Sequence, residues 1–285
     1  MRLTKIDAPD FDLARTLDSG QVFHWERCGA GHIGTIDSFG VYVEQQDDQL
    51  LFSGTSPEMI RHYFALDHQL AKIRQSFPKD APMRAARDFC KGLRIIRQPK
   101  WECLATFITS SMKQVAHIRQ ISRKLRERFG KSVRVLDLEV YLFPKAARLA
   151  ELSEGDLRAC SLGYRAKTLL ATAHLIASGK ATLEQWERLS DEALRTRLCE
   201  LPGVGAKVAN CVMLFTYERL RAFPIDVWIE RVLREKYFPG KRKVTTAQLR
   251  DFSETYFGKN GGYAQQYLFH HARKGSNRRP IETCV

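Results

Sequence analysis

Short runs in which hydrophobic and polar residues alternate fill the chain up to about residue 54. Gly, Asp and Ser residues separate these runs, which are QVFHW (21–25), HIGTI (32–36), VYVEQ (41–45) and LLFSG (50–54). A period of two with turn residues between the runs is typical of antiparallel strands joined by tight turns. The pattern therefore predicts a small antiparallel sheet near the N-terminus.

From Ser56 onward the hydrophobic period changes to that of a helix. The segment SPEMIRHYFAL opens with Ser56 and Pro57, a cap residue followed by a proline in the first turn. Apolar residues then recur three and four positions apart. This predicts helices near 102–111, 115–130, 144–160, 164–179, 182–199, 206–217, 225–237, 246–257 and 262–273. We expect an α+β fold, with a small N-terminal antiparallel sheet domain and flanking helices at 1–92 and a large all-helical domain at 93–285.

The chain is strongly basic, with 46 Lys and Arg against 32 Asp and Glu in 285 residues and a net charge of +14. Such an excess suits a polyanionic partner such as nucleic acid, and a basic protein without such a partner is the alternative. Basic residues recur along the whole chain, which favours a folded binding surface over a disordered arm. No signal-peptide core and no stretch of membrane-spanning length is visible. We expect an intracellular protein that associates with DNA and not with membranes.

The seven cysteines are scattered along the chain and form no CxxC pair. Their odd number and spacing indicate free thiols in a reducing compartment. They also provide no four-cysteine cluster for zinc or for an iron–sulfur centre.

The segment LPGVGAKVANC (201–211) places Gly203 and Gly205 directly before a helix. One face of that helix is apolar, at Val208, Cys211, Val212 and Phe215. The backbone N–H groups of such a turn form an anion site, and a DNA phosphate is the anion expected for a basic protein. A tight connection without a ligand is the alternative, because a short Gly-x-Gly stretch is weak evidence by itself.

Lys207 lies in the first turn of the same helix, one turn before Cys211. The positive end of the helix dipole and partial burial both disfavour a charged amine at this position. The local pattern leaves two interpretations open, a functional amine and a solvated surface lysine. Further along, FPIDVWIERV (223–232) places Asp226 at the start of another helix, where it would also serve as an N-cap.

A helix–hairpin–helix followed by a lysine, and then by a proline-containing approach to an aspartate, resembles the helix-hairpin-helix DNA glycosylase superfamily. Three further stretches, LDSGQVFHW (17–25), SLGYRAKTL (161–169) and GGYAQQYLFHHAR (261–273), resemble its 8-oxoguanine DNA glycosylases. The resemblance runs from about Phe11 to Arg273. It implies two helical bundles around a cleft in the second domain, with the helix-hairpin-helix at about 194–216.

The resemblance implies a bifunctional enzyme of base-excision DNA repair, a DNA N-glycosylase that is also an apurinic or apyrimidinic site lyase. Such an enzyme flips the damaged nucleotide out of the duplex. An uncharged Lys207 amine would attack C1′ to give a Schiff base, which permits β-elimination of the 3′ phosphate. Asp226 would stabilise positive charge on the sugar. Two alternatives stay open: a glycosylase of this fold for alkylated purines, and a non-catalytic DNA-binding module.

The family's base-recognition residues correspond here to Gly20, Cys211, Gln265 and Phe269. Gln265 and Phe269 are four apart and share one helical face, so the ring would stack on the flipped base while the amide meets its Watson–Crick edge. Cys211 would cover the opposite face of the base. The Gly20 carbonyl would accept N7–H, a donor that 8-oxoguanine has and guanine lacks. Gly20 as a turn residue and Phe269 as a core residue are the structural alternatives.

The resemblance also implies contacts with the duplex, at Met112, Lys113, His117, Tyr164, Arg165, Gly203 and Gly205. Four positions depart from the family pattern, namely Met112 in place of asparagine, His117 in place of arginine, Trp228 in place of histidine and Ala272 in place of an acidic residue. The resemblance further implies a monomer that binds 8-oxoguanine duplex DNA and needs no metal or organic cofactor. It allows for a monovalent cation at the hairpin, residues 201–206.

Overall fold

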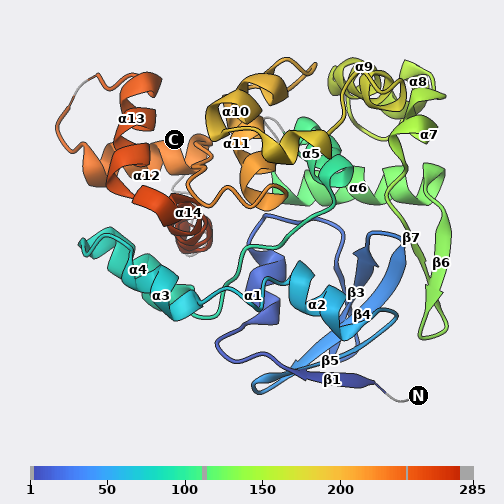
Figure 1. Cartoon of the computed structure of the whole chain (residues 1–285), viewed down its shortest axis with the longest axis horizontal. Helices are drawn as coiled ribbons and strands as arrows, with labels where there is room; N and C mark the ends of the chain where they lie inside the picture. The colour runs from blue at the N-terminus through green and yellow to red at the C-terminus, as the bar shows by residue number, and fades with distance from the viewer. Residues whose placement is uncertain (1–2, 111–113, 242, 277–285) are drawn as a thin grey trace, which may run out of the picture.

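A computed structural model describes residues 3–110, 114–241 and 243–276 of the chain. Figure 1 shows a β-sheet at one end of the molecule and a larger assembly of helices at the other. The sheet is antiparallel, with five strands in the order β1-β5-β4-β3-β2. The strands are β1 (Thr4–Asp7), β2 (Glu26–Cys28), β3 (Gly31–Ile36), β4 (Phe39–Gln46) and β5 (Gln49–Ser53). The predicted N-terminal sheet is therefore confirmed.

Helices form most of the remaining described chain. They are α1 (Leu13–Asp18), α2 (Pro57–Tyr63), α3 (Leu70–Gln75), α4 (Ala81–Phe89), α5 (Lys100–Thr109), α6 (Val115–Phe129), α7 (Ala146–Ala150), α8 (Glu154–Arg158), α9 (Arg165–Ala177), α10 (Asp191–Cys199), α11 (Ala206–Phe215), α12 (Val227–Tyr237), α13 (Thr246–Tyr256) and α14 (Gly261–Ser276). This is the predicted α+β architecture (Figure 1). Within the described ranges, no helix has the length and hydrophobicity that a membrane span requires.

The run at 21–25 is not a strand, contrary to the prediction, and β2 begins only at Glu26. Its alternation is real but divides the side chains between two cores. Val22 and Trp25 pack in the core of the sheet region, whereas Phe23 packs among the helices. The buried Gln21 side chain meanwhile bonds to the backbone of residues 94 and 96, so backbone-to-side-chain bonds replace a strand ladder. The same hydrophobic pattern thus serves a segment that bridges two cores.

A β-hairpin within the helical region was not predicted. Strands β6 (Ser132–Val135) and β7 (Leu138–Tyr141) pair around a two-residue turn, in which Leu136 and Asp137 have φ of 51° and 61°. Two consecutive positive φ angles are the geometry of a tight hairpin turn, but Leu-Asp is not the usual Asn-Gly signal. The hairpin packs on the N-terminal sheet, because a Cβ at Gly40 of β4 would meet Val140 at 2.9 Å and Val133 at 3.2 Å.

Two predicted helices are each broken by a serine cap. The segment 144–160 forms two helices, α7 and α8, because a capping box at Ser153 starts the second one. The Ser153 hydroxyl accepts the Asp156 N–H, and the Asp156 carboxylate accepts the Ser153 N–H. The segment 182–199 forms a short 3₁₀ turn (Gln185–Arg188) and then α10, whose N-cap is Ser190. Apolar spacing continues across both breaks, so periodicity alone does not reveal them.

The buried apolar side chains form two cores. One lies between the sheet, α1 and α2, and it includes Val41, Val43, Phe52 and Phe64. The other runs through the helices, and α3 and α4 contribute Leu70, Ile73, Met83 and Ala86 to it. The boundary between the two sequence domains at residue 92 stays a prediction.

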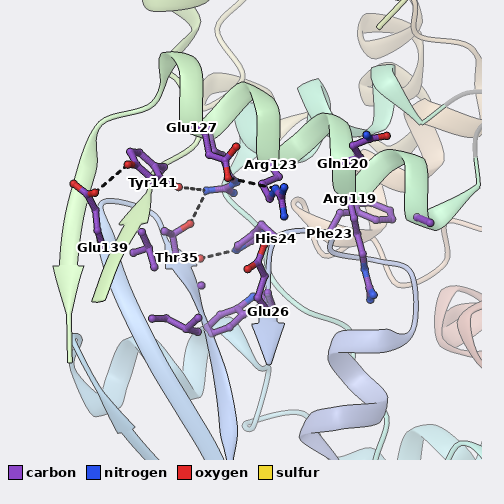
Figure 2. Close-up of a pocket in the computed structure, with 16 residues that line it drawn as sticks. Phe23, His24, Glu26, Thr35, Arg119, Gln120, Arg123, Glu127, Glu139 and Tyr141 are labelled. Atoms are coloured by element: carbon purple, nitrogen blue, oxygen red, sulfur yellow. Dashed lines mark hydrogen bonds and ion pairs between the residues drawn. The ribbon is translucent and has the colours of Figure 1, made fainter. Parts of the chain in front are cut away.

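A buried polar network joins the sheet to the helices. Arg126 of α6 forms an ion pair with Glu102 of α5, and it also donates to the Thr35 hydroxyl at 2.8 Å and to the Tyr141 carbonyl at 3.0 Å. His24 lies 3.1 Å from Glu102 and 2.8 Å from the Thr35 carbonyl. Burial, and next the charge of Arg126, hold the pKa of His24 well below its usual range. The network forms one wall of a pocket of about 420 Å³, shown in Figure 2.

Replacing Arg126 with methionine is expected to lower the free energy of unfolding by about 3–5 kcal/mol, because Glu102 would stay buried without its cation. Arg123→Met is the matched control, since it removes an exposed pair with Glu127 on the same helix and should cost less than about 1 kcal/mol. Urea unfolding followed by circular dichroism measures both variants. Equal losses in the two variants would show that the buried network stabilises the fold no more than an exposed ion pair does.

Candidate active site

The predicted hairpin connects α10 to α11. Gly203 has φ of +82°, and a Cβ there would meet the Thr168 side chain of α9 at 2.9 Å, so glycine allows both the turn and its packing. Gly205 is the N-cap of α11 and has open space where a side chain would stand. No side chain in the described part of the molecule caps α11. Its first backbone N–H groups are therefore available to an anion, as the sequence predicts.

Lys207 follows this hairpin and is partly buried. Its Nζ donates to the Ser110 hydroxyl at 3.1 Å and lies 5.1 Å from the centre of the Phe107 ring. Both neighbours belong to α5 or its C-cap. The amine is thus directed against the end of another helix, and the interpretation as a solvated surface lysine is wrong.

Asp226 is the N-cap of α12, as expected from its position. Its Oδ1 accepts the backbone N–H groups of Trp228 at 3.1 Å and Ile229 at 2.9 Å. Burial raises the pKa of Asp226 above its usual 3.8, although the Ile229 hydrogen bond and the charge of Lys207 act in the opposite direction. Within the described residues, Oδ2 takes part in no hydrogen bond. One carboxylate oxygen therefore caps the helix and the other is available to a ligand.

One small pocket gathers six of the predicted residues, which come from four separate parts of the chain. Its volume is about 40 Å³, and the predicted residues that line it are Gly20, Lys207, Cys211, Asp226, Gln265 and Phe269. The larger pocket of Figure 2 contains none of the predicted site residues.

Two walls of this pocket are suited to a flat base. Phe269 lies against Gly20, where a Cβ would meet the ring at 2.9 Å, so only glycine fits at that position. The Gln265 side chain is 4% exposed, and its Oε1 has no hydrogen-bond partner in the described structure. A buried acceptor without a partner among the described residues is able to accept a hydrogen bond from a ligand or a water.

Cys211 faces the same pocket and is 3% exposed. Burial raises the pKa of its thiol to about 11, although Lys207 lies beside it and acts to lower the pKa. Cys211 is therefore a neutral thiol at neutral pH, and Lys207 gains no counter-charge from it.

Four pocket residues were missed by the sequence reasoning, namely Phe107, Phe215, Pro224 and Gln266. The rings of Phe107 and Phe215 stack with centroids 5.5 Å apart. Both occupy buried positions of a helical pattern, which gives the same signal as an ordinary core residue. Pro224 and Gln266 lie inside stretches quoted above, FPIDVWIERV (223–232) and GGYAQQYLFHHAR (261–273), so closeness to Asp226 and Gln265 was the available signal.

The predicted DNA contacts that the structure describes lie outside this pocket. Tyr164 is the N-cap of α9 and is 64% exposed, while Arg165 is 5% exposed and its guanidinium lies 4.3 Å from the centre of the Tyr164 ring. His117 is exposed in the first turn of α6. Met112 and Lys113 lie outside the described residues. Trp228 is partly buried, and the guanidinium of Arg231 lies 5.5 Å from its ring.

Comparison with protein families and known proteins identifies the family of the chain. Residues 4–104 match the 8-oxoguanine DNA glycosylase N-terminal domain, and residues 105–255 match the HhH-GPD superfamily of base excision DNA repair proteins. The N-glycosylase/DNA lyase OGG1 of Arabidopsis thaliana is 29% identical over 93% of this chain and 78% of its own length. A probable N-glycosylase/DNA lyase of Methanothermobacter thermautotrophicus is 28% identical over 95% of this chain and 96% of its own.

A solved structure covers nearly the whole chain. It is the Clostridium acetobutylicum 8-oxoguanine glycosylase/lyase in complex with duplex DNA that contains cytosine opposite 8-oxoguanine. It is 30% identical, with a TM-score of 0.89, and the alignment covers 97% of this chain and 100% of that one. The family models and this similarity together cover both the sheet and the helices. The chain belongs to the 8-oxoguanine DNA glycosylases of the helix-hairpin-helix superfamily.

Proposed function

We propose that this protein excises 8-oxoguanine from duplex DNA and then cleaves the resulting abasic site by β-elimination. The observation that carries the proposal is the shared pocket, in which an amine, a carboxylate, a neutral thiol, an unpartnered amide and an aromatic ring surround one small space. Relatives named as N-glycosylase/DNA lyases support the two-step activity.

The chemistry follows from Lys207 and Asp226. The Lys207 amine attacks C1′ as the bond to the base breaks, so the base leaves with the bonding electrons and takes up a proton. Positive charge develops on the sugar during this step, and the adjacent Asp226 carboxylate stabilises it. The C1′–O4′ bond then breaks, O4′ takes up a proton and stays on the sugar as the C4′ hydroxyl, and the nitrogen lone pair forms the C=N bond of the Schiff base. Removal of a C2′ proton then expels the 3′ phosphate, which cleaves the strand.

Recognition of the base follows from the other pocket residues. The flipped base would stack between Phe269 and Cys211, and the Gln265 Oε1 would accept a hydrogen bond from its Watson–Crick edge. The Gly20 carbonyl would accept N7–H of 8-oxoguanine. Guanine has a bare N7 acceptor instead, and an unmet buried polar group costs about 1–3 kcal/mol. The carbonyl therefore contributes part of the discrimination, and the remaining pocket contacts supply the rest.

Contacts outside the pocket would hold the duplex. The N–H groups at Gly203 and Gly205 would bind a phosphate, Tyr164 would enter the base stack, and Arg165 would meet the estranged base. Three further predictions stay predictions: a monovalent cation at residues 201–206, a monomeric state, and an intracellular location at the DNA. The proposed excision activity is tested by incubating the protein with a labelled 8-oxoguanine duplex and measuring the free base released by chromatography. Release of alkylated purines alone, or DNA binding without any release, would favour one of the two alternatives.

Excision of 8-oxoguanine opposite A, G or T is expected to be within about tenfold of excision opposite C, a difference of at most about 1.4 kcal/mol. An arginine offers a rigid bidentate fork to the acceptors of cytosine, whereas His117 is shorter and presents either a donor or an acceptor. Arg165 would then be the main reader of the opposite base. Single-turnover rates on four duplexes that differ only at the opposite base measure the preference.

The variant His117→Arg provides the comparison for this experiment. It should increase the preference for cytosine by about tenfold, because it restores the bidentate donor. A preference for cytosine of a hundredfold or more in the unmodified protein would show that another residue already reads it.

A further inference from the structure

The backbone around Gly20 is held by three side chains from other parts of the chain. Arg273 of α14 donates to the Asp18 carbonyl, Gln266 of α14 donates to the Ser19 carbonyl at 2.9 Å, and Gln98 donates to the Gln21 carbonyl at 2.7 Å. Within the described residues, the Gly20 carbonyl accepts no hydrogen bond. The carbonyl groups of Ser19 and Gln21, on either side of Gly20, are therefore held by hydrogen bonds. The Gly20 carbonyl is left for a ligand.

The glutamine side chains that form hydrogen bonds around Gly20 are buried, which strengthens those bonds. Gln266 is 2% exposed and Gln21 is fully buried. The Gln21 side chain also donates to the Ser19 hydroxyl at 2.9 Å and to the Arg94 carbonyl at 2.8 Å. Glycine has the widest backbone freedom of any residue, and Gly20 has φ of +84°. The direction of its carbonyl therefore depends on the bonds made by its neighbours.

A cluster of positive charges surrounds the Asp18 side chain, two residues before Gly20. The Asp18 carboxylate, at the end of α1, pairs with Lys274 at 2.5 Å, Arg119 at 3.3 Å and Arg273 at 3.8 Å. Figure 2 shows Arg119 extending down from α6. Burial acts to raise the pKa of Asp18, but the Lys274 hydrogen bond and the three positive charges outweigh it and hold the pKa below 3.8. Asp18 is therefore ionised at neutral pH.

The same cluster touches the aromatic wall of the pocket. The Arg273 guanidinium lies 5.8 Å from the centre of the Phe269 ring, and that ring lies against Gly20. Asp18 therefore links the end of α1 to α6 and to the end of α14, which carries Phe269.

We propose that Asp18 and Gln266 are positioning residues that fix the direction of the Gly20 carbonyl and so set the discrimination between 8-oxoguanine and guanine. Neither side chain needs to touch the base to do this. Gln266 acts through the Ser19 carbonyl next to Gly20, and Asp18 acts through Arg273, which also donates to the Asp18 carbonyl. The inference rests on the proposed function, because it assigns the Gly20 carbonyl to N7–H of the oxidised base.

Two variants and one control test the proposal. Asp18→Asn removes the charge that holds the cluster, and Gln266→Met removes the donor to Ser19 while keeping the length of the side chain. Asp10→Asn is the control, since Asp10 forms a comparable pair with Arg74, at 2.8 Å, that does not line the pocket. All three are made in the Lys207→Gln background, so that binding is measured without turnover.

The measurement compares the affinity for two duplexes, one with 8-oxoguanine and one with 7-deaza-8-oxoguanine, which has C–H in place of N7–H. The parent and the Asp10→Asn control should prefer the N7–H base by about tenfold, the value of one buried hydrogen bond. Asp18→Asn and Gln266→Met should reduce this preference to about threefold or less. A preference unchanged in both variants would overturn the inference. A parent without any preference would instead contradict the proposed reading of N7–H, and the inference with it.

Incision of a preformed abasic site separates positioning from general damage to the fold. This substrate has no base to read, so Asp18→Asn in an otherwise unmodified chain should incise it at a rate within about twofold of the parent. Loss of incision in Asp18→Asn, in parallel with its loss of preference, would show that Asp18 serves the fold and would overturn the proposal.

Discussion

Replacing Lys207 with glutamine is expected to abolish base release and borohydride-trapped adducts together, with a fall of at least about a thousandfold in rate. Glutamine is similar in length but has no basic amine, so it can form neither the bond to C1′ nor the Schiff base. Binding of 8-oxoguanine duplex should stay within about tenfold, because the role of Lys207 is covalent rather than electrostatic. Single-turnover excision, trapping and a binding titration on one duplex measure all three effects.

Lys167→Gln is the matched control for this experiment. Lys167 is an exposed lysine of α9, next to Thr168, which packs on the hairpin at Gly203. Its replacement removes the same charge from the same region and should leave trapping intact. Strand incision by the Lys207→Gln variant would show that another amine is the nucleophile. Equal loss of activity in both variants would show that positive charge, and not covalent attack, is what Lys207 supplies.

Replacing Asp226 with asparagine is expected to lower the excision rate by about 10²–10³, the usual effect of removing one group that stabilises charge in a transition state. Affinity should change little, because the charge matters mainly once the sugar becomes positive. Asparagine is as good an N-cap as aspartate, so α12 should keep its start. Rates and dissociation constants on the same duplex distinguish the two effects.

The pH dependence gives a second readout for Asp226. Burial raises the pKa of this carboxyl above 3.8, so the catalytic anion is lost on acidification sooner than for a free aspartate. The excision rate should therefore fall on the acidic side with a midpoint above 3.8, and Asp226→Asn should lack that limb. Asp80→Asn, at the N-cap of α4, is a control for capping and should retain full activity. Equal losses of rate and affinity in Asp226→Asn would assign Asp226 to structure.

The features that the sequence predicts well are local in the chain. The hairpin at Gly203 and Gly205, the lysine one position into the helix and the cap at Asp226 each depend on a few adjacent residues. Turn geometry, helix starts and capping act over that range, so they can be inferred from spacing. Gly20 and Phe269 were predicted only from the family resemblance, because no local pattern places residues so far apart in one pocket.

The features that the sequence does not predict depend on long-range packing. The run at 21–25 alternates like a strand, yet its side chains divide between two cores. Gln266 looks like an ordinary polar position of α14 until its bond to Ser19 is seen. Asp18 is similar, because its three cations come from α6 and α14. Contacts between residues so far apart leave no periodic signal in a single sequence.

The most direct test of the central claim, that Lys207 forms the covalent intermediate, is to locate the trapped adduct. The unmodified protein is incubated with an 8-oxoguanine duplex in the presence of borohydride, digested with protease and nuclease, and analysed by mass spectrometry. Reduction of the Schiff base leaves a stable sugar remnant on the attacking amine. The account predicts that this remnant lies on Lys207. A remnant on another lysine or on the N-terminal amine, or turnover without any trapped adduct, would contradict it.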